Sequence, residues 1–359
     1  MKTLTVNASK TYNIIIGKNL LEEAGGFIRK AAGGQRAAIV ADTNVAELYG
    51  DRLARSLLQN NYRTVHYVFP HGESSKNAET FLSLLSFLAE EKFSRRDIVI
   101  ALGGGVTGDL AGFASACYMR GVPFVQIPTT LLAAVDSSVG GKTAINLASG
   151  KNLAGAFYQP SLVICDVSLL STLSEEVLCD GSSEVIKYGM IADQALFYSL
   201  ETPIHTQFEE IIIRCVEIKR DIVSEDEFET GKRKLLNFGH TIGHAIELLS
   251  EYQTSHGHAV AAGMAIITRA AYRMGLCGEQ CLSALLKLLK QYTLPVNTLY
   301  KPDSLVRACL SDKKRDGETL SIIFPLETGN CMIKEIPFKE LETVIALGTE
   351  SAGFEDAVQ

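Results

Sequence analysis

The sequence has no apolar run long enough for a transmembrane helix, because its longest apolar stretches have only the length of strands. Its first residues, MKTLTVNASKTYNIIIG, alternate like a β-strand and lack the apolar core and the small-residue cleavage site of a signal peptide. The eight cysteines are scattered and include no CxxC pair, a distribution typical of reduced, mostly buried thiols. We therefore expect a cytoplasmic protein without a membrane partner.

The chain also has no excess of positive charge, because its 359 residues carry a formal net charge of −7. This balance argues against nucleic acid as a partner, because a phosphate backbone requires a basic surface. A local group of cations can still bind a small anion. The apolar content of 47% and the charged content of 21% are those of an ordinary globular protein with room for two domains.

Two familiar motifs are present only in incomplete form. The segment VDSSVGGKT (135–143) ends like a P-loop, but Asp136 stands where G-x-x-x-x-G-K-[ST] requires its first glycine. His240 and His244 lie four residues apart, as in the zincin motif HExxH, but Thr241 stands where that motif has its general-base glutamate. Both the P-loop and the zincin interpretation are therefore excluded.

The N-terminal part of the chain alternates between apolar strands and helix-like stretches. The helix-like stretches are 44–60 and 77–93. The strands are expected at 37–42, 64–70, 97–103, 124–129 and 161–166. This alternation predicts an α/β domain with a mostly parallel, Rossmann-like sheet covered on both faces. In such sheets ligands bind at the carboxyl ends of the strands.

After about residue 168 the periodicity becomes helical and stays so until Leu310, followed by a β-like piece at 319–337. We therefore predict an α/β domain over 1–170. A mainly α-helical domain is predicted over 171–359.

The segment DIVIALGGGVTGDLAGFASA (97–116) places three glycines between a strand and a helix. Glycines at this point allow a pyrophosphate to approach the N-terminus of the helix, although a simple tight turn has the same composition. Polar residues stand at the ends of two other strands, at Asp42 and at Thr129–Thr130, and suit contacts to ribose and phosphate. Together these features favour a dinucleotide.

Histidines suggest a metal centre. His240 and His244 share one face of a helix, and His256 and His258 follow in SHGHAVAAGM. A catalytic zinc takes three His or Glu ligands and keeps one position open. Both Glu184 and Glu247 can supply the carboxylate, and spacing alone does not choose between them.

Several cations stand in glycine-rich or apolar surroundings, unlike ordinary surface charge. The segments GGKTAINL and GKNLAGAFYQP read as loops that hold an ammonium group in place. Such a set suits a phosphorylated substrate that also carries a carboxylate. The cations are Arg120, Lys142, Lys151, Lys187, Arg233, Lys234, Lys313 and Lys314.

The ordered motifs, from about residue 36 to 325, closely resemble those of the 3-dehydroquinate synthase family. They are ALGGGVTGDLAGFASACYMRG, QIPTTLLAAVDSSVGGKTAIN, GKNLAGAFYQP, GSSEVIKYG, LLNFGHTIGHAIE, HGHAVAAGM and DKKRDG. The resemblance implies one active site between the two domains, with bound NAD and a divalent metal, zinc or alternatively cobalt. It implies conversion of 3-deoxy-D-arabino-heptulosonate 7-phosphate to 3-dehydroquinate and phosphate. The implied steps are transient oxidation by NAD, phosphate elimination, reduction, ring opening and aldol cyclisation, so the enzyme is a carbon–oxygen lyase of the shikimate pathway.

The resemblance also assigns roles to individual residues. It places the metal on Glu184, His240 and His256, and gives His244 a place beside the metal in substrate handling. It assigns the substrate's anionic groups to Lys142, Lys151, Asn152, Lys187, Arg233, Asn237 and one of Lys313 or Lys314, with Lys314 preferred. Arg120 matches an arginine that reaches the neighbouring subunit's phosphate pocket, which implies a homodimer. NAD contacts are implied for Asp42, Glu73, Lys76, Gly104, Gly105, Val106, Asp109, Thr129, Thr130, Asp136, Ser137, Lys142, Lys151 and Thr172.

One residue departs from the family pattern, and two other functions compete with it. The family usually reads HGEAVA, whereas this chain has His258, interpreted as a tolerated change or as a competing ligand beside His256. The alternatives are another sugar-phosphate cyclase, of the inosose or valiolone type, and a metal-dependent polyol dehydrogenase. Arg233, Asn152 and the DKK segment match the dehydroquinate pattern, and a neutral polyol does not require so many cations.

Overall fold

The computed structural model describes residues 1–313 and 318–350, which form two compact units. The first unit consists of Met1–Ser174 and Phe208–Phe228, and the second of Glu175–Gln207 and Glu229–Gln359.

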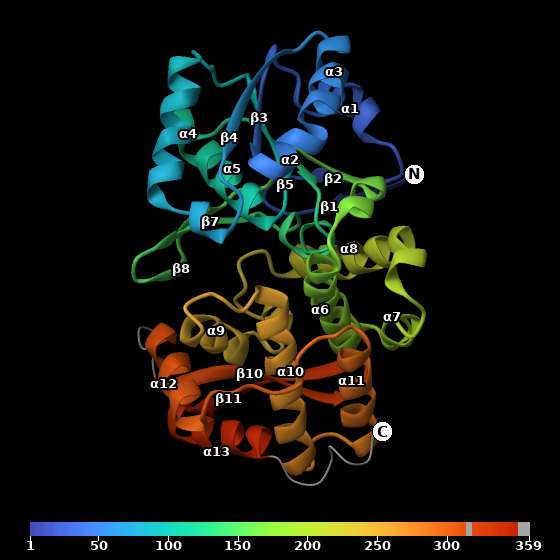
Figure 1. Ribbon diagram of the computed structural model, residues 1–359, viewed down its shortest axis with the longest axis vertical. Helices are drawn as coiled ribbons and strands as arrows, with labels where there is room; N and C mark the ends of the chain where they lie inside the picture. Colours follow the sequence, from blue (N-terminus) through green and yellow to red (C-terminus); the bar gives the residue numbers. More distant parts are fainter. Residues whose placement is uncertain (314–317, 351–359) are drawn as a thin grey trace. The chain divides into compact units, whose positions relative to one another are not determined.

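The first unit is built on a seven-stranded sheet in the order β1-β2-β9-β6-β5-β3-β4 (Figure 1). Only β1 and β2 pair antiparallel, and the remaining neighbours are parallel. The strands are β1 (Lys2–Val6), β2 (Tyr12–Gly17), β3 (Arg36–Asp42), β4 (Arg63–Phe69), β5 (Ile98–Gly103), β6 (Phe124–Pro128) and β9 (Leu162–Asp166). The predicted mostly parallel sheet is therefore confirmed.

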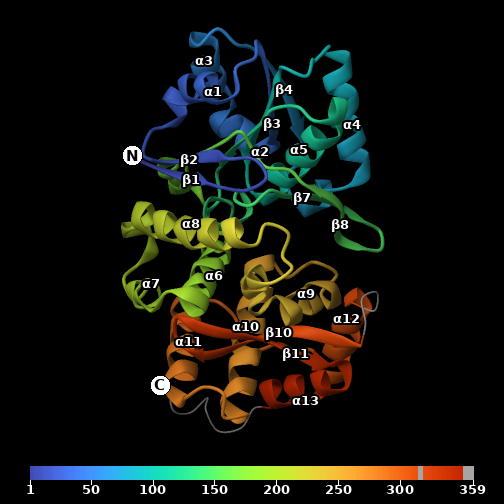
Figure 2. The same ribbon diagram turned by 180° about the vertical axis from the view of Figure 1, so that it is seen from behind.

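Helices cover both faces of this sheet, with α1 (Ala24–Ala32) and α3 (Asp51–Gln59) on one face. On the other face lie α4 (Ala78–Glu90) and α5 (Gly105–Cys117), as Figures 1 and 2 both show. Successive strand residues join opposite cores, because side chains alternate across a strand. For example, Ile39 packs on the α1–α3 side and Val40 on the α4–α5 side. Burial on both faces explains why β3, β5 and β6 are almost wholly apolar.

The two segments interpreted as loops form instead a β-hairpin of β7 (Lys142–Leu147) and β8 (Gly150–Phe157). The interpretation was wrong because it took glycine as a sign of irregular chain. Gly155 pairs with Ala144 across the hairpin, and a Cβ at Gly155 would lie 2.2 Å from the carbonyl oxygen of Thr143. Here the glycine permits close approach of two strands.

Helix α8 (Phe208–Glu225) belongs to the first unit, whereas the sequence division placed these residues in the second domain. It packs against β1, β2 and the turn Ala133–Ser137. Its helical periodicity continues that of its neighbours in sequence, so no local signal marks the return of the chain to the first unit.

The second unit is mainly helical, with one hairpin formed by β10 (Thr319–Glu327) and β11 (Asn330–Pro337). Its helices are α6 (Glu175–Ala192), α7 (Gln194–Ser199), α9 (His240–Leu249), α10 (His256–Arg273), α11 (Glu279–Gln291), α12 (Pro302–Lys313) and α13 (Phe338–Thr349). Helix α10 is buried along most of its length and packs against α6, α9, α11 and α13. Such all-round burial requires the apolar composition that α10 shows.

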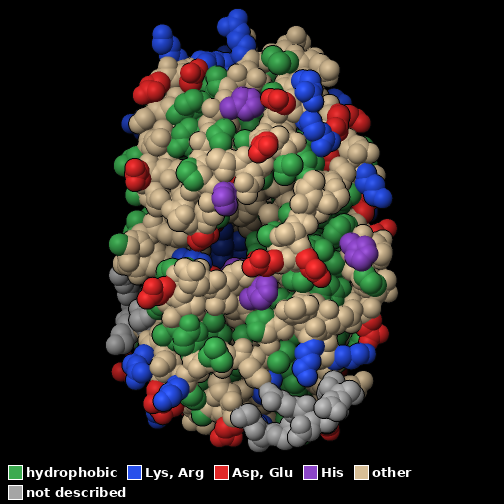
Figure 3. Space-filling model, in the orientation of Figure 1, with side chains coloured by type: hydrophobic (Ala, Val, Ile, Leu, Met, Phe, Trp, Pro, Cys, Tyr) green, Lys and Arg blue, Asp and Glu red, His purple; other side chains and the backbone are tan. Residues whose placement is uncertain are grey.

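The surface carries side chains of both charge signs interspersed, as the face drawn in Figure 3 shows. Within residues 1–313 and 318–350, no helix combines the length and the hydrophobicity that crossing a bilayer requires.

Candidate functional site

A buried carboxylate and a buried ammonium group lie one turn apart on α6. The side chains of Glu184 and Lys187 are each 1% exposed, and the Lys187 ammonium forms an ion pair with Oε2 of Glu184. Charged groups are rarely buried unless they are paired or bind an ion. The Glu184–Lys187 pair is therefore the starting point of the candidate site in the second unit.

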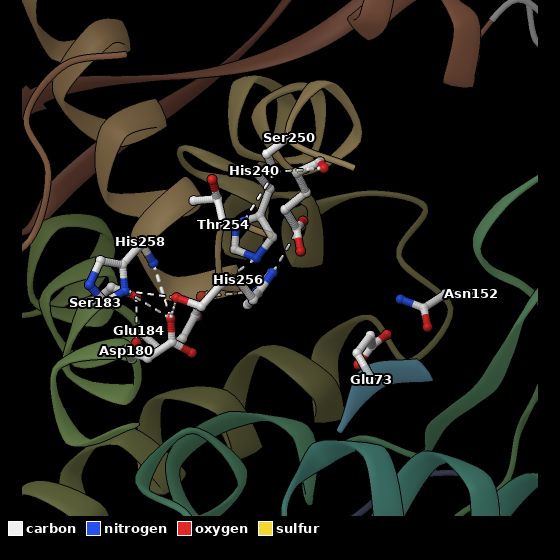
Figure 4. A network of polar contacts seen from close by, with 12 residues as sticks. Glu73, Asn152, Asp180, Ser183, Glu184, His240, Ser250, Thr254, His256 and His258 are labelled. Atoms are coloured by element: carbon white, nitrogen blue, oxygen red, sulfur yellow. Dashed lines mark hydrogen bonds and ion pairs between the residues drawn. The ribbon is translucent and has the colours of Figure 1, made fainter. Parts of the chain in front are cut away.

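Two histidines present the same ring atom to Glu184. Nε2 of His240 lies 3.6 Å from Oε1 of Glu184, and Nε2 of His256 lies 3.5 Å from that oxygen. Figure 4 shows the three side chains gathered from α6, α9 and α10. On its other side, Nδ1 of His240 lies 3.2 Å from the carbonyl oxygen of Phe238. A carbonyl accepts only from N–H, so this contact leaves Nε2 of neutral His240 with a lone pair.

The electrostatic surroundings of the two histidines differ. Burial and the nearby Lys187 ammonium hold the pKa of His240 well below its usual value. Burial would also lower the pKa of His256, but hydrogen bonds to Glu184 and Glu247 outweigh it and raise this pKa to about 10.

The described residues offer two overlapping groups of possible metal ligands. Glu184, His240 and His256 each place one ligand atom within 4.8 Å of the others, and so do His244, Glu247 and His256. The first group has the two imidazoles and one carboxylate of a catalytic zinc site. It is the set assigned by the family resemblance, and its residues fit a divalent metal.

Glycines allow the helices that carry these ligands to approach closely. Gly239 precedes α9 with φ of 81°, and a Cβ there would lie 2.5 Å from Cγ of Met264 on α10. Gly257 follows His256, and a Cβ there would lie 1.9 Å from the carbonyl oxygen of Asp180 on α6. Backbone contacts therefore hold α6, α9 and α10 together at the ligand positions.

His258, the departure from the family pattern, faces Asp180. Its Nδ1 lies 3.3 Å from Oδ1 of Asp180 and 2.8 Å from Oγ of Ser255, the N-cap residue of α10 (Figure 4). Burial would raise the pKa of Asp180, but hydrogen bonds from His258 and Ser255 lower it. Within the described residues His258 is in neither ligand group, and its contacts instead join the start of α10 to α6.

The other predicted residues of the second unit lie on different elements. Arg233 is fully buried in the 3₁₀ turn Lys232–Asn237, and Asn237 donates a hydrogen bond to Glu229. His244 is exposed on α9, 5.5 Å from His240 between ring centres. Lys314 and the side chain of Lys313 lie outside the described residues. Lys234, also one of the candidate cations, contacts Ser321 and Glu335 of the β10–β11 hairpin.

In the first unit, the glycine-rich turn leads from β5 into α5, with Gly104 at the N-cap. A Cβ at Gly104 would lie 3.0 Å from Cγ2 of Thr130, and one at Gly105 would lie 3.3 Å from Oγ of Ser137. Asp42, at the end of β3, accepts hydrogen bonds from the next backbone amides and caps a short helix. An open backbone at a helix N-terminus, flanked by hydroxyl groups, fits a pyrophosphate. Val106 belongs to the first turn of α5, and Thr129 directly follows β6.

Three predicted site residues of the first unit, Lys76, Asp109 and Asn152, are held together by the Lys76 ammonium group. The Lys76 ammonium lies 2.5 Å from Oδ2 of Asp109 and donates to Oδ1 of Asn152 at 2.6 Å. Burial raises the pKa of Asp109 despite this opposing ammonium. Glu73 accepts a hydrogen bond of 2.7 Å from Asn146 on β7. The structure thus brings predicted NAD residues together with Asn152, which was assigned to the substrate.

Lys219 is a buried cation that the sequence analysis missed. Its ammonium lies 3.0 Å from Oδ1 of Asp136 and 2.6 Å from that residue's carbonyl oxygen. A signal was available, because Cys215, Lys219 and Ile222 follow helical spacing on the buried face of α8. A lysine in such a stripe is seldom mere surface charge.

The remaining predicted residues of the first unit are more accessible. Lys142 is exposed at the start of β7, and Lys151 is half-buried in β8. The Thr172 hydroxyl lies 2.6 Å from the Tyr49 hydroxyl. Arg120 is exposed, and with Met119 and Gly121 it forms three consecutive residues with positive φ.

Comparisons with known proteins place this fold and these residues in a family. The models of the 3-dehydroquinate synthase N-terminal and C-terminal regions match residues 66–180 and 181–315. The 3-dehydroquinate synthase of Clostridium acetobutylicum is 40% identical over 348 residues, covering 95% of this chain and 98% of that protein. That of Vibrio atlanticus is 42% identical over 352 residues, covering 94% and 96%. The chain belongs to the 3-dehydroquinate synthase family.

Solved structures of sugar-phosphate cyclases share the fold. A 2-deoxy-scyllo-inosose synthase complexed with carbaglucose-6-phosphate, NAD⁺ and Co²⁺ is 28% identical, with a TM-score of 0.85 and coverage of 96% and 99%. The 2-epi-5-epi-valiolone synthase of Streptomyces hygroscopicus, with bound NAD⁺ and Zn²⁺, is also 28% identical, with a TM-score of 0.85 and coverage of 96% and 98%. A butanol dehydrogenase of Thermotoga maritima, 14% identical with a TM-score of 0.68 and coverage of 98% of both chains, shares the fold alone.

Proposed function

We propose that this chain converts 3-deoxy-D-arabino-heptulosonate 7-phosphate to 3-dehydroquinate and phosphate, with NAD and a divalent metal. Family membership supports the reaction. The observation that carries the metal dependence is the group of buried Glu184 and half-buried His240 and His256, whose ligand atoms lie within 4.8 Å of one another. NAD⁺ with Co²⁺ or Zn²⁺ in two related cyclases supports the cofactors.

The proposed chemistry divides between cofactors and side chains. When bound, the metal polarises the substrate hydroxyl and NAD accepts and returns a hydride. Glu184, His240 and His256 hold the metal, and the depressed pKa of His240 keeps its Nε2 unprotonated for that purpose. Lys187 sits against Glu184 and places a further positive charge where a substrate oxygen would acquire negative charge.

We assign the anionic groups of the substrate to the predicted cations and amides. Arg233 offers a buried planar guanidinium, which suits a carboxylate better than an ammonium group does. With His244, which is assigned to substrate handling beside the metal, the full proposed set of substrate residues is Arg120, Lys142, Lys151, Asn152, Lys187, Arg233, Asn237, His244 and Lys314.

The proposed NAD contacts lie in the first unit. The open backbone at Gly104 and Gly105 suits the pyrophosphate, and the caps and hydroxyl groups around it suit the ribose and phosphate oxygens. The set is Asp42, Glu73, Lys76, Gly104, Gly105, Val106, Asp109, Thr129, Thr130, Asp136, Ser137, Lys142, Lys151 and Thr172.

Zinc as the native metal, a homodimer and a cytoplasmic location belong to the same proposal. None of the eight cysteines, all of which lie within the described residues, forms a disulfide, which supports a reducing compartment. The homodimer rests on the match of Arg120, an exposed residue, to the family arginine that reaches the neighbouring subunit.

We expect purified protein with Zn²⁺ or Co²⁺ and catalytic NAD to release inorganic phosphate from the heptulosonate phosphate without accumulating NADH. Phosphate is measured by a colorimetric assay and NADH by its near-ultraviolet absorbance. Turnover of glucose 6-phosphate instead would favour an inosose synthase. Stoichiometric NADH from a polyol would favour a dehydrogenase.

Lys142→Ala should lower kcat/KM for phosphate release by about 100-fold or more, because it removes a cation from the substrate's phosphate. Lys142 is exposed on an edge of the β7–β8 hairpin, so circular dichroism and the melting temperature should not change. Lys30→Ala, at an exposed lysine of α1, is the control and should keep wild-type kinetics. Wild-type kinetics in Lys142→Ala would show the assignment of this lysine to be wrong.

A further inference from the structure

His256 is contacted on both ring nitrogens by buried carboxylates. Its Nε2 lies 3.5 Å from Oε1 of Glu184, and its Nδ1 lies 3.5 Å from Oε2 of Glu247. The Glu247 side chain is 2% exposed, so it is as deeply buried as the proposed metal ligand. The family resemblance left Glu247 without a role once Glu184 was chosen as the ligand.

The position of the proton on the His256 ring decides which of its two nitrogens can bind a metal. A neutral imidazole carries one N–H, and only the other nitrogen has a lone pair for a metal. An acceptor fixed at Nδ1 keeps the proton there and orients the ring, so that Nε2 becomes the ligand atom. A carboxylate is a stronger acceptor than a neutral group and also makes the ligand nitrogen more basic.

We propose that Glu247 is a positioning residue, which accepts the Nδ1–H of His256 and so presents Nε2 to a metal shared with Glu184 and His240. This inference rests on the proposed metal site and adds to it a residue that does not touch the metal. Glu247 acts only through His256.

The second histidine of the group supports this assignment independently. His240 also directs Nδ1 at a protein acceptor, the carbonyl oxygen of Phe238 at 3.2 Å, and Nε2 at Glu184. Both histidines therefore show the same polarity, with Nδ1 toward the protein and Nε2 toward the carboxylate on α6. One is fixed by the backbone and the other by a side chain that mutagenesis can change.

The same atoms allow a different function for Glu247. His244, Glu247 and His256 also lie close enough to hold a cation, and Nδ1 is the His256 nitrogen that faces Glu247. If both groups held a metal at once, both nitrogens of His256 would bind metal, with no N–H left on the ring. Wild type would then bind two metals per chain, and the stoichiometry of binding separates that arrangement from the proposal.

The test is cobalt binding to the metal-free chain, measured against a competing chelator, together with the visible absorption of bound Co²⁺. Wild type should bind one Co²⁺ per chain. Glu247→Leu should bind it about 10- to 100-fold more weakly, with an altered cobalt spectrum. Glu247→Gln, whose amide oxygen can still accept the Nδ1–H, should recover most of that affinity. Glu251→Gln, at an exposed glutamate just after α9, is the matched control and should bind like wild type.

Each alternative outcome is decisive. Unchanged cobalt affinity and spectrum in Glu247→Leu, with only a lower melting temperature of the metal-free chain, would reduce Glu247 to a packing residue. Binding of two Co²⁺ by wild type and one by Glu247→Leu would assign it as a ligand of a second metal. No cobalt binding by wild type would instead overturn the metal site of the proposed function.

Discussion

Glu184→Gln is expected to abolish metal binding and phosphate release, and to destabilise the metal-free protein. Glutamine keeps the shape of the side chain but removes the charge that pairs with Lys187, which is 1% exposed. Breaking a buried ion pair from one side leaves an uncompensated charge and costs about 3 kcal/mol or more. The free energy of unfolding is measured in denaturant without metal, and metal binding by cobalt titration.

Two further variants separate the contributions to this result. Compared with Glu184→Gln alone, the double variant Glu184→Gln/Lys187→Met should recover much of the stability, because it removes the ammonium that has lost its carboxylate partner. It should recover no activity, because the metal ligand Glu184 is still missing. Glu201→Gln breaks the exposed pair of Glu201 with Lys287 and should cost less than about 1 kcal/mol. Metal affinity of wild-type strength in Glu184→Gln would contradict the assignment of this residue.

Asp136→Ala should destabilise the first unit more than Lys219→Met does. The side chain of Lys219 is 6% exposed and that of Asp136 is 23% exposed. Removing the Asp136 side chain therefore takes the counter-charge from a buried ammonium, which keeps its hydrogen bond to the backbone carbonyl of residue 136, at a cost of about 3 kcal/mol. Removing Lys219 leaves a carboxylate that still reaches water, at about 1 kcal/mol. Equal costs, or a larger cost for Lys219→Met, would contradict this account.

The double variant Asp136→Ala/Lys219→Met completes a thermodynamic cycle measured by denaturant unfolding. It should be more stable than Asp136→Ala alone, because the lysine no longer needs a counter-charge. Asp136→Ala should also lower phosphate release, because Asp136 is one of the proposed NAD contacts. Additive effects on stability would show that the two side chains do not interact.

The sequence predicted those helices and strands whose own residues show a clear apolar pattern. The strands β3, β5, β6 and β9 are short apolar runs between turn residues, and the structure has them within one or two residues of their predicted bounds. The helical character of the second unit was predicted for the same reason. The hairpin β7–β8 was missed because glycine marks close strand approach there and not a loop.

Contacts between distant segments were beyond sequence reasoning. No local feature connects Lys219 with Asp136 across 83 residues. The contact of His240 Nδ1 with the carbonyl of Phe238 spans only two residues, but spacing does not show which ring nitrogen faces the backbone. Spacing likewise left Glu184 and Glu247 equivalent as ligands. The structure shows that His256 contacts both carboxylates through different nitrogens, Nε2 toward Glu184 and Nδ1 toward Glu247. The two glutamates therefore differ in which nitrogen of His256 they contact.

The return of α8 to the first unit has a consequence for how the chain folds during synthesis. The chain passes between the units at Ser174, Gln207 and Phe228, so the first unit is not complete when its sheet has emerged from the ribosome. Until α8 follows, the surface of β1 and β2 that it covers stays open to water and Asp136 lacks its ammonium partner. The usual rule that N-terminal domains finish folding first therefore does not apply. A fragment ending at Ser174 should aggregate, and the same fragment should be rescued by a peptide of residues 208–228.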